Sequence, residues 1–155
     1  MNTQALGSLK ERLVGTWTLQ SYVETNTDTQ EVTEPMGRGP HGFIIYTSDG
    51  YMSAQISAAG RSSFSADDMF GGSGKEYTEA GQSYLAYSGP FDVDEGARKV
   101  FHNISVSLYP NWVGMRQVRI VTLTGDTLRL SFESPQLSRG AMRTADLVWI
   151  RAAFR

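Results

Sequence analysis

The chain has 155 residues, which suits one domain that can bury a core without a disulfide or a structural metal. Its 14 basic and 16 acidic residues give a net charge of −2, which argues against nucleic-acid and anionic-membrane partners. The absence of cysteine excludes disulfides, thiolate nucleophiles and cysteine-based zinc or iron–sulfur sites. We expect a single domain over residues 1–155.

Residues 4–12 predict a short helix with Leu6 and Leu9 on one side. This region has no apolar core of signal-peptide length, and no apolar run in the chain approaches the ~20 residues of a membrane span. These features predict a cytoplasmic protein. Alternation over residues 13–24 predicts a strand whose apolar, inward face holds Gly15, Trp17, Leu19, Ser21 and Val23.

A long loop is expected at residues 25–41, and a tight hairpin turn at Ser48-Asp49-Gly50. The small, polar residues 58–73 lead into a glycine-rich run, but no βαβ unit, which a phosphate loop needs, surrounds it. Residues 75–84 predict a short helix that forms a lid on the β scaffold. The other strands are predicted at 42–47, 51–57, 85–96, 98–109, 115–123, 127–133 and 143–154.

The count is eight strands joined mainly by short turns, without alternating helices. An antiparallel sheet of this size must close or fold over to hide its edges. The expected fold is therefore an all-β, eight-stranded, antiparallel up-and-down barrel, whose interior has room for side chains or one small ligand.

Two sequence features resemble the calycin pattern, in which an arginine of the last strand stacks on a tryptophan of the first. The first strand carries Gly15-Thr16-Trp17, and the last carries Arg151. The segments LVGTWTLQSY, GFIIYTSDGYMSAQ, GQSYLAYSGPFDVDE and VSLYPNWVGMRQVR together resemble the lipocalin-like domain proteins of bacteria and fungi. This resemblance covers residues 10–151 and implies a calycin-type barrel. It implies either a carrier of hydrophobic ligands or a cyclase or isomerase of secondary metabolism, since a fold does not determine function.

His102 is the main candidate for acid–base chemistry, because it shares an apolar strand face with Val100, Ile104, Val106 and Leu108. The alternative is a core histidine held by one hydrogen bond. If the face of Arg119 points inward, its guanidinium needs an anionic partner, either a ligand oxygen or an internal acid. If that face points outward, Arg119 is a solvated charge. Tyr87 joins His102 and Arg119 as the third expected catalytic residue.

Ligand contacts are expected from aromatic and neutral polar side chains, which are typical of small-molecule pockets. For each tyrosine the alternative is packing, with its hydroxyl at the surface. Trp112 follows the strand-breaking Pro110 and is expected to cover the barrel mouth, with a plain core position as the alternative. The expected set is Tyr46, Tyr51, Ser53, Gln55, Tyr84, Asn111, Trp112 and Trp149.

His41 and His102 are the only histidines and form no metal-ligand motif, so no metal and no cofactor are expected. The first functional hypothesis is a cofactor-independent cyclase or isomerase, or a dehydratase or hydrolase, acting on a polyketide-like or terpenoid-like molecule. The second is a carrier with the same pocket and no turnover. The partner in both is a small hydrophobic or aromatic ligand. The sequence is compatible with a homodimer and leaves the inward face of residues 51–57, 98–109 and 115–123 open.

Overall fold

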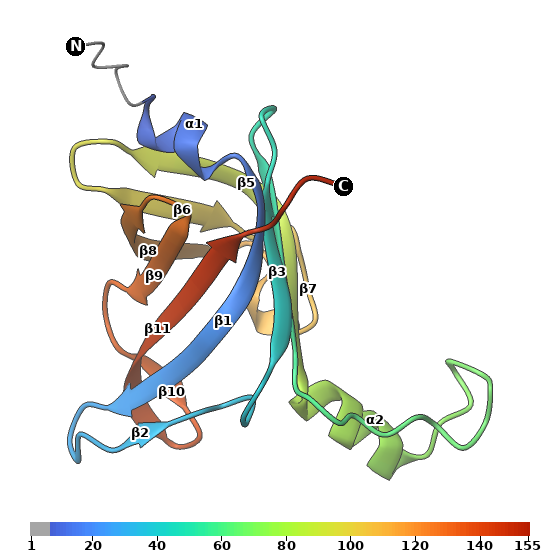
Figure 1. Ribbon diagram of the computed structural model, residues 1–155. Coiled ribbons are helices and arrows are strands. Elements are labelled where there is room, and N and C mark those ends of the chain that lie inside the picture. Colours follow the sequence, from blue (N-terminus) through green and yellow to red (C-terminus); the bar gives the residue numbers. More distant parts are fainter. Residues whose placement is uncertain (1–6) are drawn as a thin grey trace.

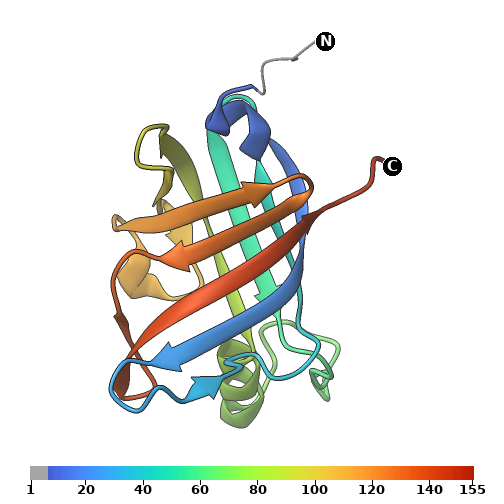
Figure 2. The ribbon, with the colours of Figure 1, turned by 60° about the vertical axis from the view of Figure 1, so that its left-hand side comes forward.

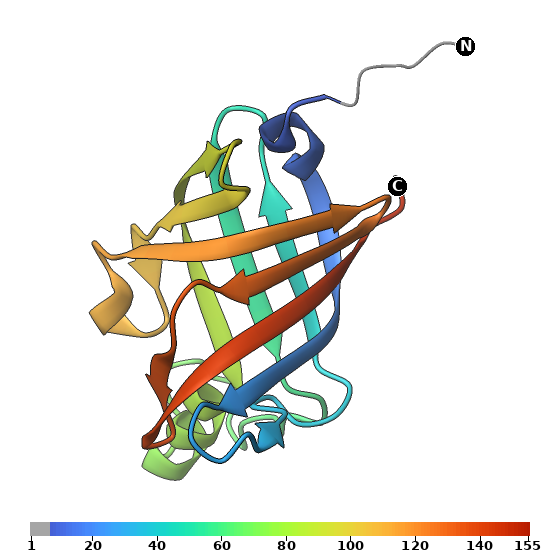
Figure 3. The same cartoon turned by 90° about the vertical axis from the view of Figure 1, so that its left-hand side faces the viewer.

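The computed structural model describes residues 7–155, in which eight antiparallel strands close into a barrel (Figures 1, 2 and 3). Each barrel strand pairs with the next along the chain, and the last pairs with the first. This arrangement confirms the predicted all-β, up-and-down barrel. The barrel strands are β1 (Gly15–Asn26), β3 (His41–Tyr46), β4 (Tyr51–Ser57), β5 (Tyr84–Asp94), β6 (Lys99–Asn103), β8 (Arg116–Thr124), β9 (Thr127–Phe132) and β11 (Ala141–Arg151).

Three short strands extend this sheet, namely β2 (Val32–Thr33), β7 (Val106–Ser107) and β10 (Gln136–Ser138). The helices are α1 (Leu9–Leu13), α2 (Gly74–Gln82) and the 3-10 turn η1 (Pro110–Trp112). The first residues of the predicted helix at 4–12, Leu6 included, lie outside the described range. Across residues 7–155, every helix is too short or too polar for a membrane span.

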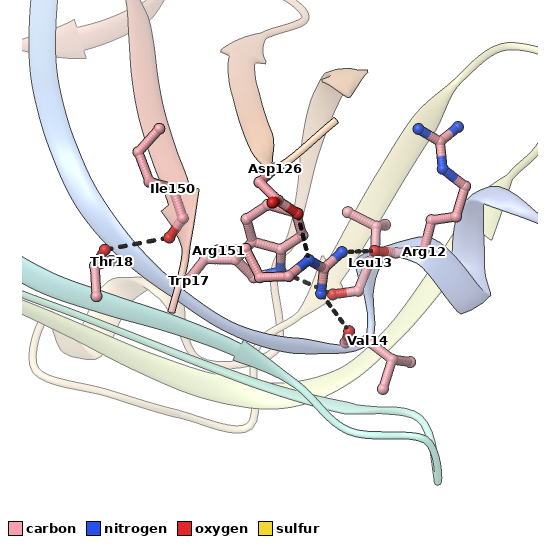
Figure 4. Close-up of polar contacts among 8 residues, drawn as sticks. All are labelled: Arg12, Leu13, Val14, Trp17, Thr18, Asp126, Ile150 and Arg151. Carbon is pink, nitrogen blue, oxygen red and sulfur yellow. Dashed lines mark hydrogen bonds and ion pairs between the residues drawn. The ribbon is translucent and has the colours of Figure 1, made fainter. Parts of the chain in front are cut away.

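The end of the barrel next to α1 is closed by Trp17 and Arg151 (Figure 4). Trp17 is fully buried, and the guanidinium carbon of Arg151 lies 4.1 Å from the centroid of its ring. Gly15 has φ 132°, and a Cβ at this position would lie 2.9 Å from Nη1 of Arg151. The stack predicted from the sequence is therefore present, and the glycine leaves the space that the guanidinium occupies.

Hydrogen bonds attach this stack to the chain around α1. Arg151 donates from Nη1 to the carbonyl of Val14 at 3.1 Å, and from Nη2 to that of Arg12 at 2.7 Å. The indole N–H of Trp17 donates to the carbonyl of Leu13 at 2.9 Å. The guanidinium thus satisfies carbonyl groups that the short helix leaves open at its C-terminal end.

A β-bulge reverses the inward face of β1 halfway along the strand. Leu19 pairs with Trp149 of β11 and Ser21 with the adjacent Val148, which leaves Gln20 as the extra residue. Beyond the bulge the buried side chains are Tyr22 and Glu24. The predicted face is therefore correct at Trp17 and wrong at Ser21 and Val23, because an inserted residue shifts the alternation by one.

The predicted strand at 98–109 is interrupted in the same way. β6 pairs His102 with Phe91 of β5, whereas β7 pairs Val106 with Ser88. The chain advances four residues on one strand and three on the other, so Val106 points outward and is 62% exposed. The apolar face predicted to include Val106 and Leu108 therefore ends at Ile104, which is buried.

Residues 58–83 form an excursion from the barrel between β4 and β5, whose adjoining ends pair at Ser57 and Tyr84. Within it, Ser73 is the N-cap of α2, and its side chain forms a capping box with that of Glu76. No residue of α2 is buried. Figure 1 shows α2 beyond the end of β5, extending away from the barrel instead of covering its opening.

Replacing Arg151 with Met should lower the free energy of unfolding by about 2 kcal/mol, because two charge-assisted hydrogen bonds and the cation–π contact are lost. Urea titration followed by tryptophan fluorescence measures the loss. The control is Asp126→Asn, since the Asp126 side chain is 80% exposed and lies 3.4 Å from Nε of Arg151. This exposed ion pair should contribute less than about 1 kcal/mol. Equal losses in both variants would contradict the structural role of the stack.

Candidate functional site

The barrel contains a cavity of about 270 Å³ in the half away from α1, near β2 and β10. Most of its lining is apolar or aromatic, and a few polar side chains from β1, β5, β8 and β10 interrupt it. This mixture is typical of sites for small molecules. The lining consists of Tyr22, Glu24, Pro35, Met36, Ile44, Ala54, Ile56, Gln82, Leu85, Tyr87, Trp112, Arg119, Leu130, Phe132, Gln136, Leu137, Ser138, Arg139, Leu147 and Trp149.

Four of the residues expected at the site line this cavity, namely Tyr87, Arg119, Trp112 and Trp149. They come from β5, β8, η1 and β11, which the barrel brings around one interior. Arg119 is 6% exposed, so the inward alternative for β8 is the one the structure adopts. The functional roles of the four remain predictions.

The structure places Tyr51, Ser53 and Gln55 on the outer face of β4, away from the cavity. The buried side chains of this strand are the apolar set Met52, Ala54 and Ile56. Apolar side chains occupy the interior because their burial is favourable. The sequence left the inward face of residues 51–57 open, and the structure directs the three expected ligand contacts on this strand outward.

Tyr84 and Asn111 also lie outside the cavity lining. Tyr84 donates a hydrogen bond to Gln55 on the outer surface. Asn111 is exposed, and its amide donates to the hydroxyl of Tyr109 at 2.9 Å. Neither side chain is directed to the cavity that the sequence analysis assigned to it.

His102 is completely buried behind the cavity wall, between two tyrosines. The hydroxyl of Tyr46 lies 2.7 Å from Nε2, and that of Tyr87 lies 2.9 Å from Nδ1. Burial, and next the positive charge of Arg119, lower the pKa of His102 to about 3. The ring is therefore neutral at pH 7, so one tyrosine donates to it and the other accepts from it.

Arg119 lines the cavity next to the buried group of His102, Tyr46 and Tyr87. Burial raises the pKa of the Tyr87 hydroxyl, and the positive charge of Arg119 partly offsets that rise. The guanidinium packs on Phe132, with its carbon 4.3 Å from the ring centroid, and donates from Nη1 to Gln117 and to the carbonyl of Val118. Within residues 7–155, no carboxylate lies within 4.0 Å of it.

Glu24 is a cavity residue that the sequence analysis missed, because the bulge at Gln20 reverses the face of β1. It is 4% exposed. Its Oε1 accepts from the Tyr22 hydroxyl at 3.2 Å, and its Oε2 accepts from Ser138 at 2.9 Å. Burial and then the charge of Glu24 raise the pKa of Tyr22. The alternation of Tyr22 and Glu24 along the strand could have placed both side chains inward, but only if the bulge at Gln20 had been known.

Trp112 borders the cavity from η1 and packs edge-on against Tyr87 and Tyr109. The ring centroids are 5.6 Å and 5.7 Å apart, respectively. Pro110 begins the turn, and Gly114, with φ 83°, ends it. Trp112 is only partly buried, and its predicted role in covering the opening stays a prediction.

Replacing His102 with Gln should weaken the pH dependence of stability. Below pH ~6.5 the unfolded imidazole binds a proton, whereas the folded ring stays neutral until about pH 3. The contribution of His102 to the free energy of unfolding is therefore complete above the pKa of the unfolded imidazole and is lost as the pH falls below it. Between pH 7 and pH 5 the wild-type free energy of unfolding should fall by about 2 kcal/mol more than that of the variant.

Urea titrations at both pH values measure this difference. His41→Gln is the matched control, because His41 is exposed on β3 and should retain the wild-type pH dependence. Parallel losses in wild type and His102→Gln would show that His102 is not the neutral, buried group described above.

Two comparisons place this barrel among known proteins. The model of the lipocalin-like domain family matches residues 14–152. The "4'-hydroxy-3'-methoxypropiophenone carrier protein ppsC" of Aspergillus oryzae is 36% identical over 104 residues, which are 63% of this chain and 94% of the relative. With its closed eight-stranded barrel and internal cavity, the chain belongs to the lipocalin-like domain family.

Proposed function

We propose that the protein is a cytoplasmic carrier that holds one compact aromatic molecule in the barrel and releases it unchanged. The observation on which the proposal depends is the mostly apolar cavity of about 270 Å³ inside the barrel. The similarity to a protein named as a carrier of an aromatic ketone favours this function over the cyclase or isomerase that ranked first from the sequence.

The size and walls of the cavity support an aromatic ligand. Its volume lies just below the ~300–1,000 Å³ of sites for drug-sized ligands, so it suits a single compact molecule. Tyr87, Trp112, Phe132 and Trp149 supply aromatic surface from four elements around the cavity. Flat rings gain contact on such walls without ordering many side chains.

The position of His102 also supports a carrier. A catalytic base must reach the proton that it removes, directly or through one water. His102 is not among the residues that line the cavity, and both ring nitrogens are hydrogen-bonded to tyrosines. A group with a pKa of about 3 is a weak base at pH 7. Its arrangement suits a residue that orients the hydroxyl of Tyr87.

The proposal predicts that 4'-hydroxy-3'-methoxypropiophenone binds with a stoichiometry of one molecule per chain. Isothermal titration calorimetry measures the affinity, and quenching of tryptophan fluorescence reports proximity to Trp112 and Trp149. Mass spectrometry after prolonged incubation should recover the ligand unchanged. Conversion to a product would favour the enzyme hypothesis instead.

The variant Ala54→Phe tests where the ligand binds, because it fills the cavity from β4, where Ala54 is 2% exposed. This variant should weaken binding at least about tenfold, because the added ring occupies the ligand's space. Ser53→Phe, on the outer face of the same strand, should bind as wild type does. If both variants bind as wild type, the ligand does not occupy the barrel.

A further inference from the structure

Two buried groups of opposite charge face the cavity without forming an ion pair with each other. Glu24 is 4% exposed and Arg119 is 6% exposed, and both line the cavity. In the part of the chain that the structure describes, neither has an oppositely charged side chain within 4.0 Å. Burying a charge without such a partner is costly, so an arrangement of this kind favours a ligand that completes it.

Arg119 offers donors to the cavity and can accept nothing. A guanidinium has five N–H donors, and the two hydrogen bonds to Gln117 and Val118 both use Nη1. The guanidinium also lies within hydrogen-bonding reach of the Tyr87 hydroxyl, which leaves at least two of its five donors for a ligand. A ligand group placed here must therefore be an acceptor, such as a carbonyl oxygen.

Glu24 offers the opposite chemistry. Its carboxylate has about four acceptor sites, of which Tyr22 and Ser138 use one each. Ser138 is held by Arg143, which donates from Nε to the Ser138 carbonyl at 3.0 Å and fixes the serine beside Glu24. A ligand group placed at the remaining sites must be a donor, such as a hydroxyl.

We propose that the ligand is a hydroxyaryl ketone or a close chemical equivalent, with its hydroxyl donating to Glu24 and its carbonyl oxygen accepting from Arg119. The inference rests on the carrier function proposed above and assigns the two polar ends of the cargo. The orientation is unique, because Arg119 cannot accept a hydrogen bond and a carboxylate cannot donate one. An analogue that lacks either group leaves a buried charge without its ligand partner.

The experiment compares three probes that differ by one polar group each. The first is 4'-hydroxy-3'-methoxypropiophenone. The second, 3'-methoxypropiophenone, lacks the hydroxyl, and the third, 2-methoxy-4-propylphenol, lacks the carbonyl. On the wild-type protein each deletion should weaken binding by about 10- to 100-fold in calorimetry, the effect of leaving a buried polar group unpaired.

Two variants then assign each group to its residue. Glu24→Gln should reduce the preference for the first probe over the second, because a neutral amide accepts more weakly than a carboxylate. Arg119→Met should remove the preference for the first probe over the third. Matched controls are Glu31→Gln and Arg116→Met, whose side chains are exposed, and both should keep the wild-type order of affinities. Thermal unfolding checks that each variant is folded.

The outcomes separate the two proposals. If wild type binds all three probes equally well, the assignment of Glu24 and Arg119 is overturned and the carrier function stands. The same holds if either folded variant weakens all three probes by one common factor. If none of the three probes binds, the carrier proposal fails for this class of ligand and the assignment fails with it.

Discussion

The pairing of β1 with β11 closes the row of antiparallel strands into a barrel, and the character of the interior depends on it. An open sheet would leave two edges and a solvated face. Closure makes the inward residues of all eight strands share one interior. It also brings Glu24 on the first strand into the same cavity as Arg119 on β8, a proximity that nothing local in the chain provides.

Much of this fold could be predicted from the sequence because β-structure repeats every two residues and its turns have recognisable residues. The strand count follows from these rules. The stack of Arg151 on Trp17 was implied by the resemblance to the calycin pattern, and the buried position of Arg119 was one of two alternatives that the sequence left open. The errors in the predicted faces of β1 and of residues 98–109 have one physical cause. A single extra residue, at Gln20 or between His102 and Val106, exchanges the two faces of a strand. Such insertions depend on the partner strand, which periodicity along one segment does not report.

The chemistry of a buried polar residue depends on its neighbours in the folded barrel, which the sequence alone does not give. His102 was the expected acid–base group, yet the barrel gives it two tyrosine partners and a strongly lowered pKa. Of its two partners, Tyr87 lines the cavity, whereas His102 itself does not. Arg119 was expected to need a ligand oxygen or an internal acid if it points inward. Within residues 7–155 no carboxylate lies within 4.0 Å of its guanidinium, which packs on Phe132. A cavity built in this way is suited to selecting a ligand more than to stabilising the empty protein.

The excursion at residues 58–83 connects two neighbouring strands, and its two ends lie side by side because Ser57 of β4 pairs with Tyr84 of β5. The barrel's register is therefore indifferent to how long this segment is, and loop length alone adds little to the free energy of closure. Gln82, at the end of α2, is among the residues that line the cavity. The length and composition of residues 58–83 can therefore vary without disturbing the strand pairing that shapes the cavity.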